Sequence, residues 1–217
     1  MKCPRCVQVI HRGAAPCPHC GFSIADADAR FGPGDFSLRC LSDLGGLIRS
    51  SERGKVERAI TRFGKKFPQL FFAVHTGPTG EGGNLRQFGF WLLNRAAFED
   101  VPVEKPNEAG ILLSIDPETK SAGITWGYLL DAFLTEDDTF AALSRAHAYM
   151  LEGHFADAAV KVIEQLTNVL ARRSAQARRD PEKFQRRVGP PKRTGGILRR
   201  LREGHRAYTG RREEVEK

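Results

Sequence analysis

The amino-acid sequence predicts an α/β fold, a three-layer sandwich in which a small mixed sheet lies between helices. Three observations support this class. Short apolar runs of strand length alternate with longer segments whose apolar residues recur at helical spacing. Residues 117–120 have the composition of a hairpin turn. The predicted order between residues 38 and 171 is helix, strand, helix, strand, strand, helix, helix, which is typical of helices that cover both faces of a sheet.

The first half of this body contains two predicted helices and one predicted strand. One helix begins near Ser51, a suitable N-cap, and Pro68 ends it. The run 70–74 is apolar and aromatic, which predicts a buried strand, and a glycine-rich loop over 76–83 follows it. Asn84 is expected to cap the second helix.

The second half of the body begins with the strongest predicted strand, residues 110–116, whose apolar run ends at the hairpin turn. Residues 121–125 return as its partner strand. Thr135 is expected to cap the following helix, with three acidic residues in the first turn, where the helix dipole favours anions. Gly153 separates this helix from the last one. The apolar stripe of the last helix comprises Phe155, Ala159, Val162, Ile163, Leu166, Val169 and Leu170.

Four cysteines at the start of the chain form two matching pairs, Cys3 with Cys6 and Cys17 with Cys20, each in a C-P-x-C motif. Each motif is a tight turn that can direct two thiolates to one point, and two such turns supply the four sulfur ligands of a tetrahedral zinc ion. Gly21 follows the second pair and can adopt the positive φ that such a turn needs. The spacing predicts a structural zinc site, because four protein ligands leave no position for a catalytic water.

Two other readings of the cysteine pairs are a disulfide framework and a redox motif. Disulfides would need an oxidising compartment, but no signal peptide opens the sequence. A redox C-x-x-C motif normally lies at a strand-to-helix junction rather than at the N-terminus. We therefore expect a zinc ribbon over residues 1–24 and a cytoplasmic, bacterial-type protein. Cys40 has no partner pattern and is expected to pack as a small apolar residue.

The rest of the chain is expected to contain a linker over 25–37, the body over 38–171 and a basic, flexible tail over 172–217. A glycine–proline–glycine sequence marks the linker. The tail contains 16 lysine and arginine residues against 6 aspartate and glutamate residues, whereas the net charge of the whole chain is +8. The excess positive charge therefore lies in the tail.

The tail can be interpreted in several ways. Its repeated arginine pairs favour salt-dependent binding to a polyanion, and its scarce aromatic residues favour phosphate contacts over base stacking. It could equally bind an anionic membrane surface or an acidic protein, or remain a solvated extension. No apolar stretch approaches the about 20 residues that span a bilayer. We expect a protein partner, with nucleic acid or an anionic membrane surface as the alternatives for residues 172–217.

Five segments of the body, taken in order, carry a family resemblance. They are 43–48, similar to a D-x-x-G-x-L opening; 71–76, a first strand; 108–113, a strand entry that ends in G-I-L-L; 126–137, a glycine-containing strand end with an L-T helix start; and 155–159, an aromatic-x-x-A helix opening. Over residues 38–170 they resemble the TPM domain, a phosphatase-like domain of thylakoid-lumen and bacterial envelope proteins. The resemblance implies a three-layer sandwich, and some members of that family are acid phosphatases or bind calcium.

The chain departs from the family pattern at acidic positions. The asparagine–aspartate signature before the second strand is replaced by Glu108 and Ala109, and the aspartate after L-T is replaced by Glu136. A phosphatase needs its acids placed within fractions of an ångström, so these changes argue against an inherited activity. Glu108, Glu136 and Asp137 are nevertheless candidate ligands for calcium or magnesium. Alternatively, the acids of the helix's first turn only stabilise its dipole.

These patterns predict a non-catalytic interaction or scaffolding protein, with a structural zinc site and a basic tail that binds a polyanion or a partner. The alternative is a metal-dependent, phosphatase-like hydrolase that acts through acids around Glu108 and Glu136. The histidines are scattered and no serine lies in a G-x-S-x-G motif, so the sequence offers little support for nucleophilic catalysis. We expect no catalytic residues.

Overall fold

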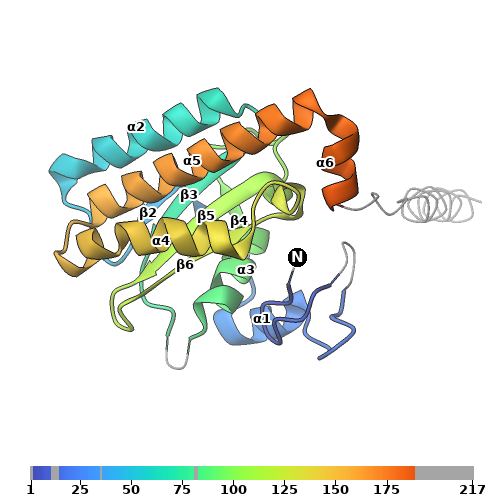
Figure 1. The fold of residues 1–217 in the computed structure, drawn as a ribbon. Coiled ribbons are helices and arrows are strands. Elements are labelled where there is room, and N and C mark those ends of the chain that lie inside the picture. Colours follow the sequence, from blue (N-terminus) through green and yellow to red (C-terminus); the bar gives the residue numbers. More distant parts are fainter. Residues whose placement is uncertain (1, 11–14, 35, 81–82, 189–217) are drawn as a thin grey trace, which may run out of the picture. The chain divides into compact units, whose positions relative to one another are not determined.

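The computed structural model describes residues 2–10, 15–34, 36–80 and 83–188 (Figure 1). The chain divides into two compact units, Met1–Ala175 and Gln176–Lys217. The first unit contains the predicted α/β fold, with helices on both faces of a small mixed sheet. Within the described part of the chain, no helix is long and apolar enough to cross a membrane.

The central sheet has four strands, in the order β2 (Leu41–Asp43), β3 (Phe71–Thr76), β5 (Gly110–Asp116) and β6 (Ser121–Trp126). The first three are parallel to one another, and β6 returns antiparallel to β5 through the predicted hairpin. The sheet is therefore mixed, as the sequence predicts. Strand β5 is buried along its whole length, whereas β6 lies at the edge and is half-buried at every residue.

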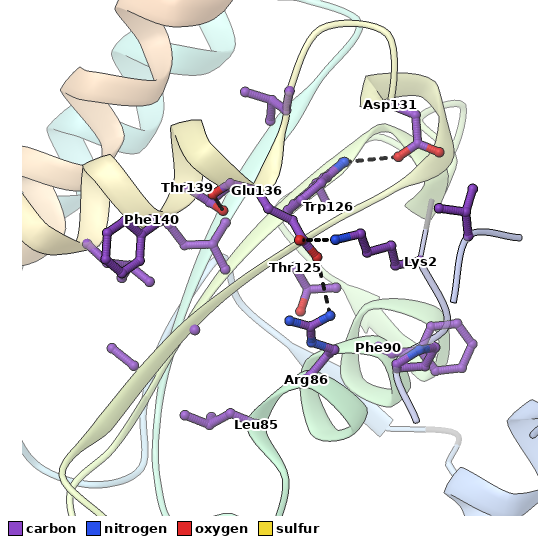
Figure 2. A pocket seen from close by; sticks show the side chains of 17 residues that line it. Lys2, Leu85, Arg86, Phe90, Thr125, Trp126, Asp131, Glu136, Thr139 and Phe140 are labelled. Atoms are coloured by element: carbon purple, nitrogen blue, oxygen red, sulfur yellow. Dashed lines mark hydrogen bonds and ion pairs between the residues drawn. The ribbon is translucent and has the colours of Figure 1, made fainter. Parts of the chain in front are cut away.

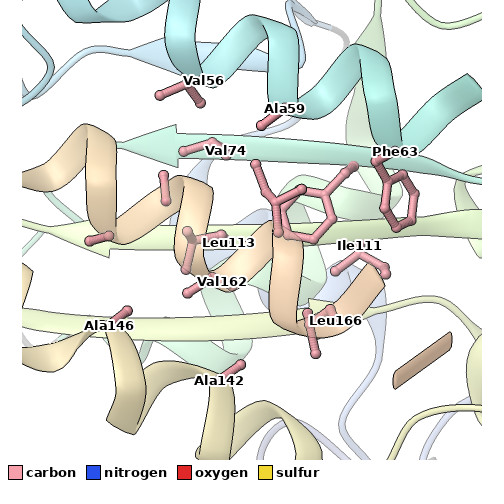
Figure 3. Close-up of a cluster of buried hydrophobic side chains, with 14 of the residues drawn as sticks. Val56, Ala59, Phe63, Val74, Ile111, Leu113, Ala142, Ala146, Val162 and Leu166 are labelled. Carbon is pink, nitrogen blue, oxygen red and sulfur yellow. The ribbon is translucent and has the colours of Figure 1, made fainter. Parts of the chain in front are cut away.

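One face of the sheet is covered by α2 (Ser50–Lys66), α4 (Glu136–Leu151) and α5 (Phe155–Arg179), as Figures 1 and 3 show. The buried side chains between these helices and the sheet include Val56, Phe63, Val74, Leu113, Val162 and Leu166, each at most 1% exposed (Figure 3). Full burial of one such side chain contributes about 1.5–3 kcal/mol. Apolar packing therefore holds this layer on the sheet.

The other face of the sheet is covered by α1 (Ile24–Phe31) and α3 (Leu85–Arg95). A small parallel sheet of β1 (Phe36–Leu38) and β4 (Ala96–Phe98) belongs to the same layer. Aromatic rings hold the layer together, since the ring of Trp91 lies 5.0 Å from that of Phe36 and 5.5 Å from that of Phe31.

Helix α3 comes unusually close to the edge strand. A Cβ atom at Gly89 would lie 2.3 Å from the hydroxyl oxygen of Thr125 on β6, which is closer than any side-chain carbon can approach. Glycine is therefore required at this position for α3 to pack where it does. This contact places the first turns of α3 beside β6 and so helps to form the cavity described below.

The predicted helices form with small differences at their ends. The side chain of Asn84 accepts hydrogen bonds from the first backbone N–H groups of α3, and Thr135 forms a capping box with Asp138 at α4, as predicted. The predicted cap of α2 is wrong. That helix begins at Ser50, and its N-cap is Arg49, whose side chain makes no capping hydrogen bond.

Short elements were not predicted. Helix α1 lies in the stretch assigned to the linker, where Ser23 and Asp26 form a capping box. Strands β1, β2 and β4 have three residues each, and the 3-10 helices are η1 (Asn107–Ala109) and η2 (Tyr128–Leu130). Elements of this length have no measurable periodicity, so tertiary pairing decides them.

The second unit contains the end of α5 and α6 (Pro181–Val188). The carboxylate of Asp180 accepts a hydrogen bond of 2.9 Å from the backbone N–H of Lys183 and so caps α6. Residues 172–188 of the predicted tail are therefore mostly helical. The rest of the predicted tail, 189–217, lies outside the described residues.

Candidate metal centre and adjoining cavity

The two C-P-x-C motifs fold into matching turns. In the first, the N–H of Cys3 donates to the carbonyl of Gln8 (2.9 Å) and the N–H of Val7 donates to the carbonyl of Cys3 (3.0 Å). In the second, the N–H of Cys17 donates to Phe22 (2.8 Å) and that of Gly21 donates to Cys17 (2.9 Å). The residue after each pair has a positive φ, 63° at Val7 and 73° at Gly21. The two turns therefore have the same backbone design.

The four cysteine sulfurs converge on one point. The Sγ atoms of Cys3 and Cys20 lie 3.7 Å apart, those of Cys6 and Cys17 lie 3.8 Å apart, and all four lie within 4.8 Å of one another. Zinc–sulfur bonds of about 2.3 Å in a tetrahedron require sulfurs about 3.8 Å apart. All five cysteines of the chain are free. The cluster can therefore hold a metal ion, and its geometry fits the four-thiolate coordination of zinc.

The local electrostatics favour a cation at this cluster. Burial opposes ionisation of Cys17, but hydrogen bonds from the backbone N–H groups of His19 and Cys20 lower the pKa of its thiol to about 6. Burial raises the pKa of Cys3. Four thiolates at such short distances repel one another, so a bound divalent cation would be needed to stabilise all four in the charged form.

The ribbon, defined here as residues 2–10 and 15–22, packs against α3. Cys3, Cys17 and Phe22 are buried in one apolar cluster with side chains of α3. The ring of Phe22 lies 5.8 Å from that of Phe90. The cysteine cluster is therefore anchored on the layer to which α3 belongs.

A cavity of about 640 Å³ adjoins the ribbon (Figure 2). Its walls come from the ribbon, the first turns of α3, the edge strand β6 and the first half of α4. The apolar lining includes Val9, Leu85, Phe90, Leu134, Phe140 and Leu143. Phe140 is 73% exposed and Val9 is 71% exposed, so two large apolar side chains of this cavity face water.

The polar groups of the cavity form two small networks (Figure 2). The carboxylate of Glu136 pairs with the ammonium of Lys2 and, at 3.3 Å, with the guanidinium of Arg86. The hydrogen bond from Lys2 and the nearby charges lower the pKa of Glu136. Separately, the indole N–H of Trp126 donates to Asp131 at 3.1 Å. Two cations thus share the single carboxylate of Glu136.

The three acids proposed for calcium or magnesium do not form one cluster. Glu108 lies in η1, Glu136 lies in the cavity at the start of α4, and Asp137 is exposed beside it. Among the described residues, the four cysteines are the only group of three or more potential ligands whose donor atoms come together.

Other acids of the body have structural partners. Burial disfavours the charged form of Asp116, but hydrogen bonds from Thr79 and from the backbone N–H groups of Thr119 and Glu118 lower its pKa to about 2. Asp43 lies in the segment that resembles the family opening. Its carboxylate accepts hydrogen bonds from the backbone N–H groups of Leu47 (3.0 Å) and Ile48 (3.1 Å). These carboxylates order loops at the end of the sheet.

Sequence reasoning missed a buried polar pair beneath α3. His75 on β3 and Ser114 on β5 are neighbours in register and are 5% and 2% exposed. Their Nδ1 and Oγ atoms have no hydrogen-bond partner within the described residues. Burial lowers the pKa of His75 to about 4, so the imidazole is neutral at pH 7. A single histidine in an apolar strand gave no signal by which this pair could be recognised.

Of three comparisons with known proteins, one, with family profiles, identifies a family. A family profile described as the TPM domain matches residues 41–169. Similar solved structures are the N-terminal domain of a protein from P. gingivalis (18% identity, 61% of this chain and 82% of that chain, TM-score 0.46), the N-terminal domain of cg2496 protein from Corynebacterium glutamicum (19%, 60% and 79%, 0.46) and BA42 protein from Bizionia argentinensis (16%, 58% and 83%, 0.48). A search of curated proteins found no match.

Proposed function

Because this chain belongs to the TPM domain family, we propose that it uses that fold as a non-catalytic interaction module, with a structural zinc ion that fixes one wall of a partner-binding cavity. The observation that carries the proposal is the apolar cavity between the ribbon, β6, α3 and α4. Large apolar side chains that remain exposed in a concave site favour a binding role.

The zinc ion is assigned to Cys3, Cys6, Cys17 and Cys20. A four-thiolate shell is closed, so the metal would supply structure and no chemistry. Its effect would reach the cavity through the backbone, because Lys2 and Val9 flank the first turn, pair in a β-bridge and both line the cavity.

The use of the acids supports a binding role over hydrolysis. Glu136 is already paired with two cations, and Asp138 forms an ion pair with Arg173 at 2.6 Å. A hydrolytic metal site would have to displace those partners. The basic segment 172–217 is proposed as a second contact region, for an acidic protein partner, nucleic acid or an anionic membrane surface.

An assay with p-nitrophenyl phosphate and added calcium, magnesium or zinc tests the catalytic alternative. We expect no turnover above that of buffer and metal alone. Metal-dependent turnover that Glu136→Gln abolishes and Glu118→Gln preserves would overturn the proposal. Glu118 is a suitable control because it is exposed in the hairpin turn, away from the cavity lining.

An apolar fluorescent dye such as anilinonaphthalene sulfonate tests the binding role of the cavity. We expect the native full chain to bind the dye and Phe140→Ser to weaken this binding. Leu151→Ser is the matched control, because Leu151 lies on the same helix, is 75% exposed and does not line the cavity. Equal effects of the two substitutions would contradict the assignment of the cavity as the binding site.

A further inference from the structure

Strand β6 is an edge strand, and its free edge lies along the cavity. It pairs only with β5 among the described strands, and Ala122 to Trp126 all line the cavity. An edge strand presents a row of unpaired N–H and C=O groups that can template the addition of another strand. The direction of these groups therefore decides what the cavity can bind.

The hydrogen-bond register fixes that direction. The N–H of Gly127 donates to the carbonyl of Gly110 at 2.9 Å, so these residues form a hydrogen-bonded pair. Such pairs alternate with non-bonded pairs along an antiparallel ladder. The backbone groups of Ala122, Ile124 and Trp126 therefore point away from β5.

The hydrogen bonds of the neighbouring strand, β5, agree with this alternation. Ile115, the partner of Ala122, uses its carbonyl to accept a hydrogen bond of 3.0 Å from Gly77, on the β3 side of β5. No hydrogen bond within the described residues involves the outward backbone groups of Ala122, Ile124 or Trp126. Three donors and three acceptors of one strand edge thus face the cavity.

Apolar side chains flank this edge on both sides. Leu85 and Phe90 of α3 lie toward one face of the sheet, and Phe140 and Leu143 of α4 lie toward the other (Figure 2). A strand added beside β6 would lie about 4.8 Å from it and would direct its side chains alternately to these two layers.

We propose that the cavity binds an extended segment of a partner protein, which adds to the sheet as a fifth strand beside β6. This inference rests on the proposed function, since it names the partner and binding mode of the same cavity. The backbone edge would supply affinity, and the flanking apolar side chains would supply specificity, as in other strand-addition complexes.

The surroundings define the chemistry of that segment. Both flanking layers present large apolar side chains beside the edge, so the side chains on both faces of the added strand should be mainly apolar, as in a strand buried on two faces. At the corner formed by the ribbon and α3, the printed ion pairs of the described residues join two cations, Lys2 and Arg86, to one carboxylate, Glu136. Asp131, the other acid of the lining, accepts the hydrogen bond of Trp126, so the positive charges outnumber the carboxylate at this corner. The partner segment is therefore a short apolar run with an acidic residue at one end.

Two fluorescein-labelled peptides test the proposal. The first is Asp-Val-Ile-Val-Phe-Thr, and in the second the aspartate follows the apolar run Val-Ile-Val-Phe instead of preceding it. We expect one of them to bind the full chain. Two N-methylated versions of that peptide are then compared, one methylated at its odd-numbered residues and one at its even-numbered residues. One version should lose binding, and the other should keep it. The reason is that only every second N–H of the peptide faces β6, and each lost hydrogen bond weakens binding about two- to tenfold.

Amide hydrogen exchange supplies a readout on the protein. Peptide binding should slow exchange at Ala122, Ile124 and Trp126, while Gly123 and Thr125, which already bond to β5, should change little. Ile124→Pro removes one outward N–H, which an edge strand tolerates, and should weaken binding. If this variant does not fold, the methylated peptides still decide the question.

Each outcome separates the inference from the proposed function. If the two methylated versions of the peptide bind equally well and Phe140→Ser weakens the binding of both, strand addition is overturned and the binding role of the cavity stays intact. Dye binding without binding of either peptide would do the same. Concentration-dependent protection of Ala122, Ile124 and Trp126 without peptide would identify a second copy as the occupant and overturn the partner assignment. Phosphomonoester turnover would overturn the proposed function itself.

Discussion

The ribbon and the sheet body keep their structure by different means. The ribbon buries only two large apolar side chains within its described residues, Ile10 and Phe22, and its strongest feature is the convergence of four sulfurs. The body buries whole strands and three helix faces in a continuous core. A bound metal would therefore do for the ribbon what apolar packing does for the body. The ribbon and the body should therefore lose their structure separately, each under its own kind of change.

Removal of the metal should have the largest effect, and it should be confined to the ribbon. Binding of zinc to structural sites contributes about 10–16 kcal/mol in small metal-dependent domains. We expect Cys3→Ser with Cys17→Ser to abolish zinc binding and to disorder the ribbon while the body stays folded. Metal analysis and amide NMR spectra measure both effects.

Cys40→Ser is the matched control for that experiment. Cys40 is buried outside the cluster, and burial raises the pKa of its thiol, so it should behave as a small apolar residue. This variant should retain zinc. Retention of zinc by the double variant, or its loss from Cys40→Ser, would refute the assignment of the four ligands.

A substitution in the body should have the second largest effect and should spare the metal. Phe63 is 1% exposed and packs 5.4 Å, ring to ring, from Phe72. Phe63→Ala should lower the free energy of unfolding by about 3–5 kcal/mol, because it removes buried apolar surface and leaves a cavity. Urea denaturation measures the loss. Zinc content should remain unchanged, and a parallel loss of zinc would show that the two regions do not fail separately.

The same contrast explains what the sequence could predict. The cysteine cluster depends on local spacing, so Cys3, Cys6, Cys17 and Cys20 could be grouped from the order of residues alone. Helical periodicity likewise predicted the long helices, and the turn composition of residues 117–120 predicted the hairpin. The family was recognised from the order of several weakly specific motifs along the chain, and no single motif would have been enough.

Features that depend on distant pairs could not be predicted. The edge position of β6 follows from strand order, which no local pattern specifies. The pairing of Glu136 with Lys2 joins residues 134 positions apart, so the acid looked like a metal ligand in sequence and lies in an ion pair in the structure. The neighbours His75 and Ser114 also meet only through the register of two strands.

The buried histidine should make the body sensitive to acid, with an effect smaller than that of Phe63→Ala. The pKa of His75 is about 4 in the folded state and about 6.5 in the unfolded state. Between these values the unfolded state binds more protons, so stability is complete above pH 6.5 and falls as the pH drops to 4. The loss amounts to about 3 kcal/mol.

Comparison with His75→Leu isolates this effect. Metal binding by thiolates is itself weakened in acid, so the wild type alone would mix the two regions. The unfolding free energy of the wild type minus that of His75→Leu, measured by urea denaturation at several pH values, should fall by about 3 kcal/mol as the pH drops from 6.5 to 4. A difference that does not change with pH would show that His75 does not titrate as its burial requires.

The smallest predicted effect lies within the ribbon and compares its two turns. Val7 and Gly21 occupy equivalent positions with positive φ, which costs a β-branched residue about 1–2 kcal/mol and costs glycine almost nothing. Gly21→Val should therefore lower the zinc affinity about five- to thirtyfold, since the ribbon and its metal site form together. Val7→Gly should raise the affinity slightly, because relief of strain is partly offset by the greater flexibility of glycine in the unfolded chain. Competition with a zinc chelator measures both changes. If the two substitutions change zinc affinity in the same direction, the turns do not share one backbone design. If neither changes zinc affinity but either changes the stability of the body, the division between a ribbon held by metal and a body held by packing is wrong.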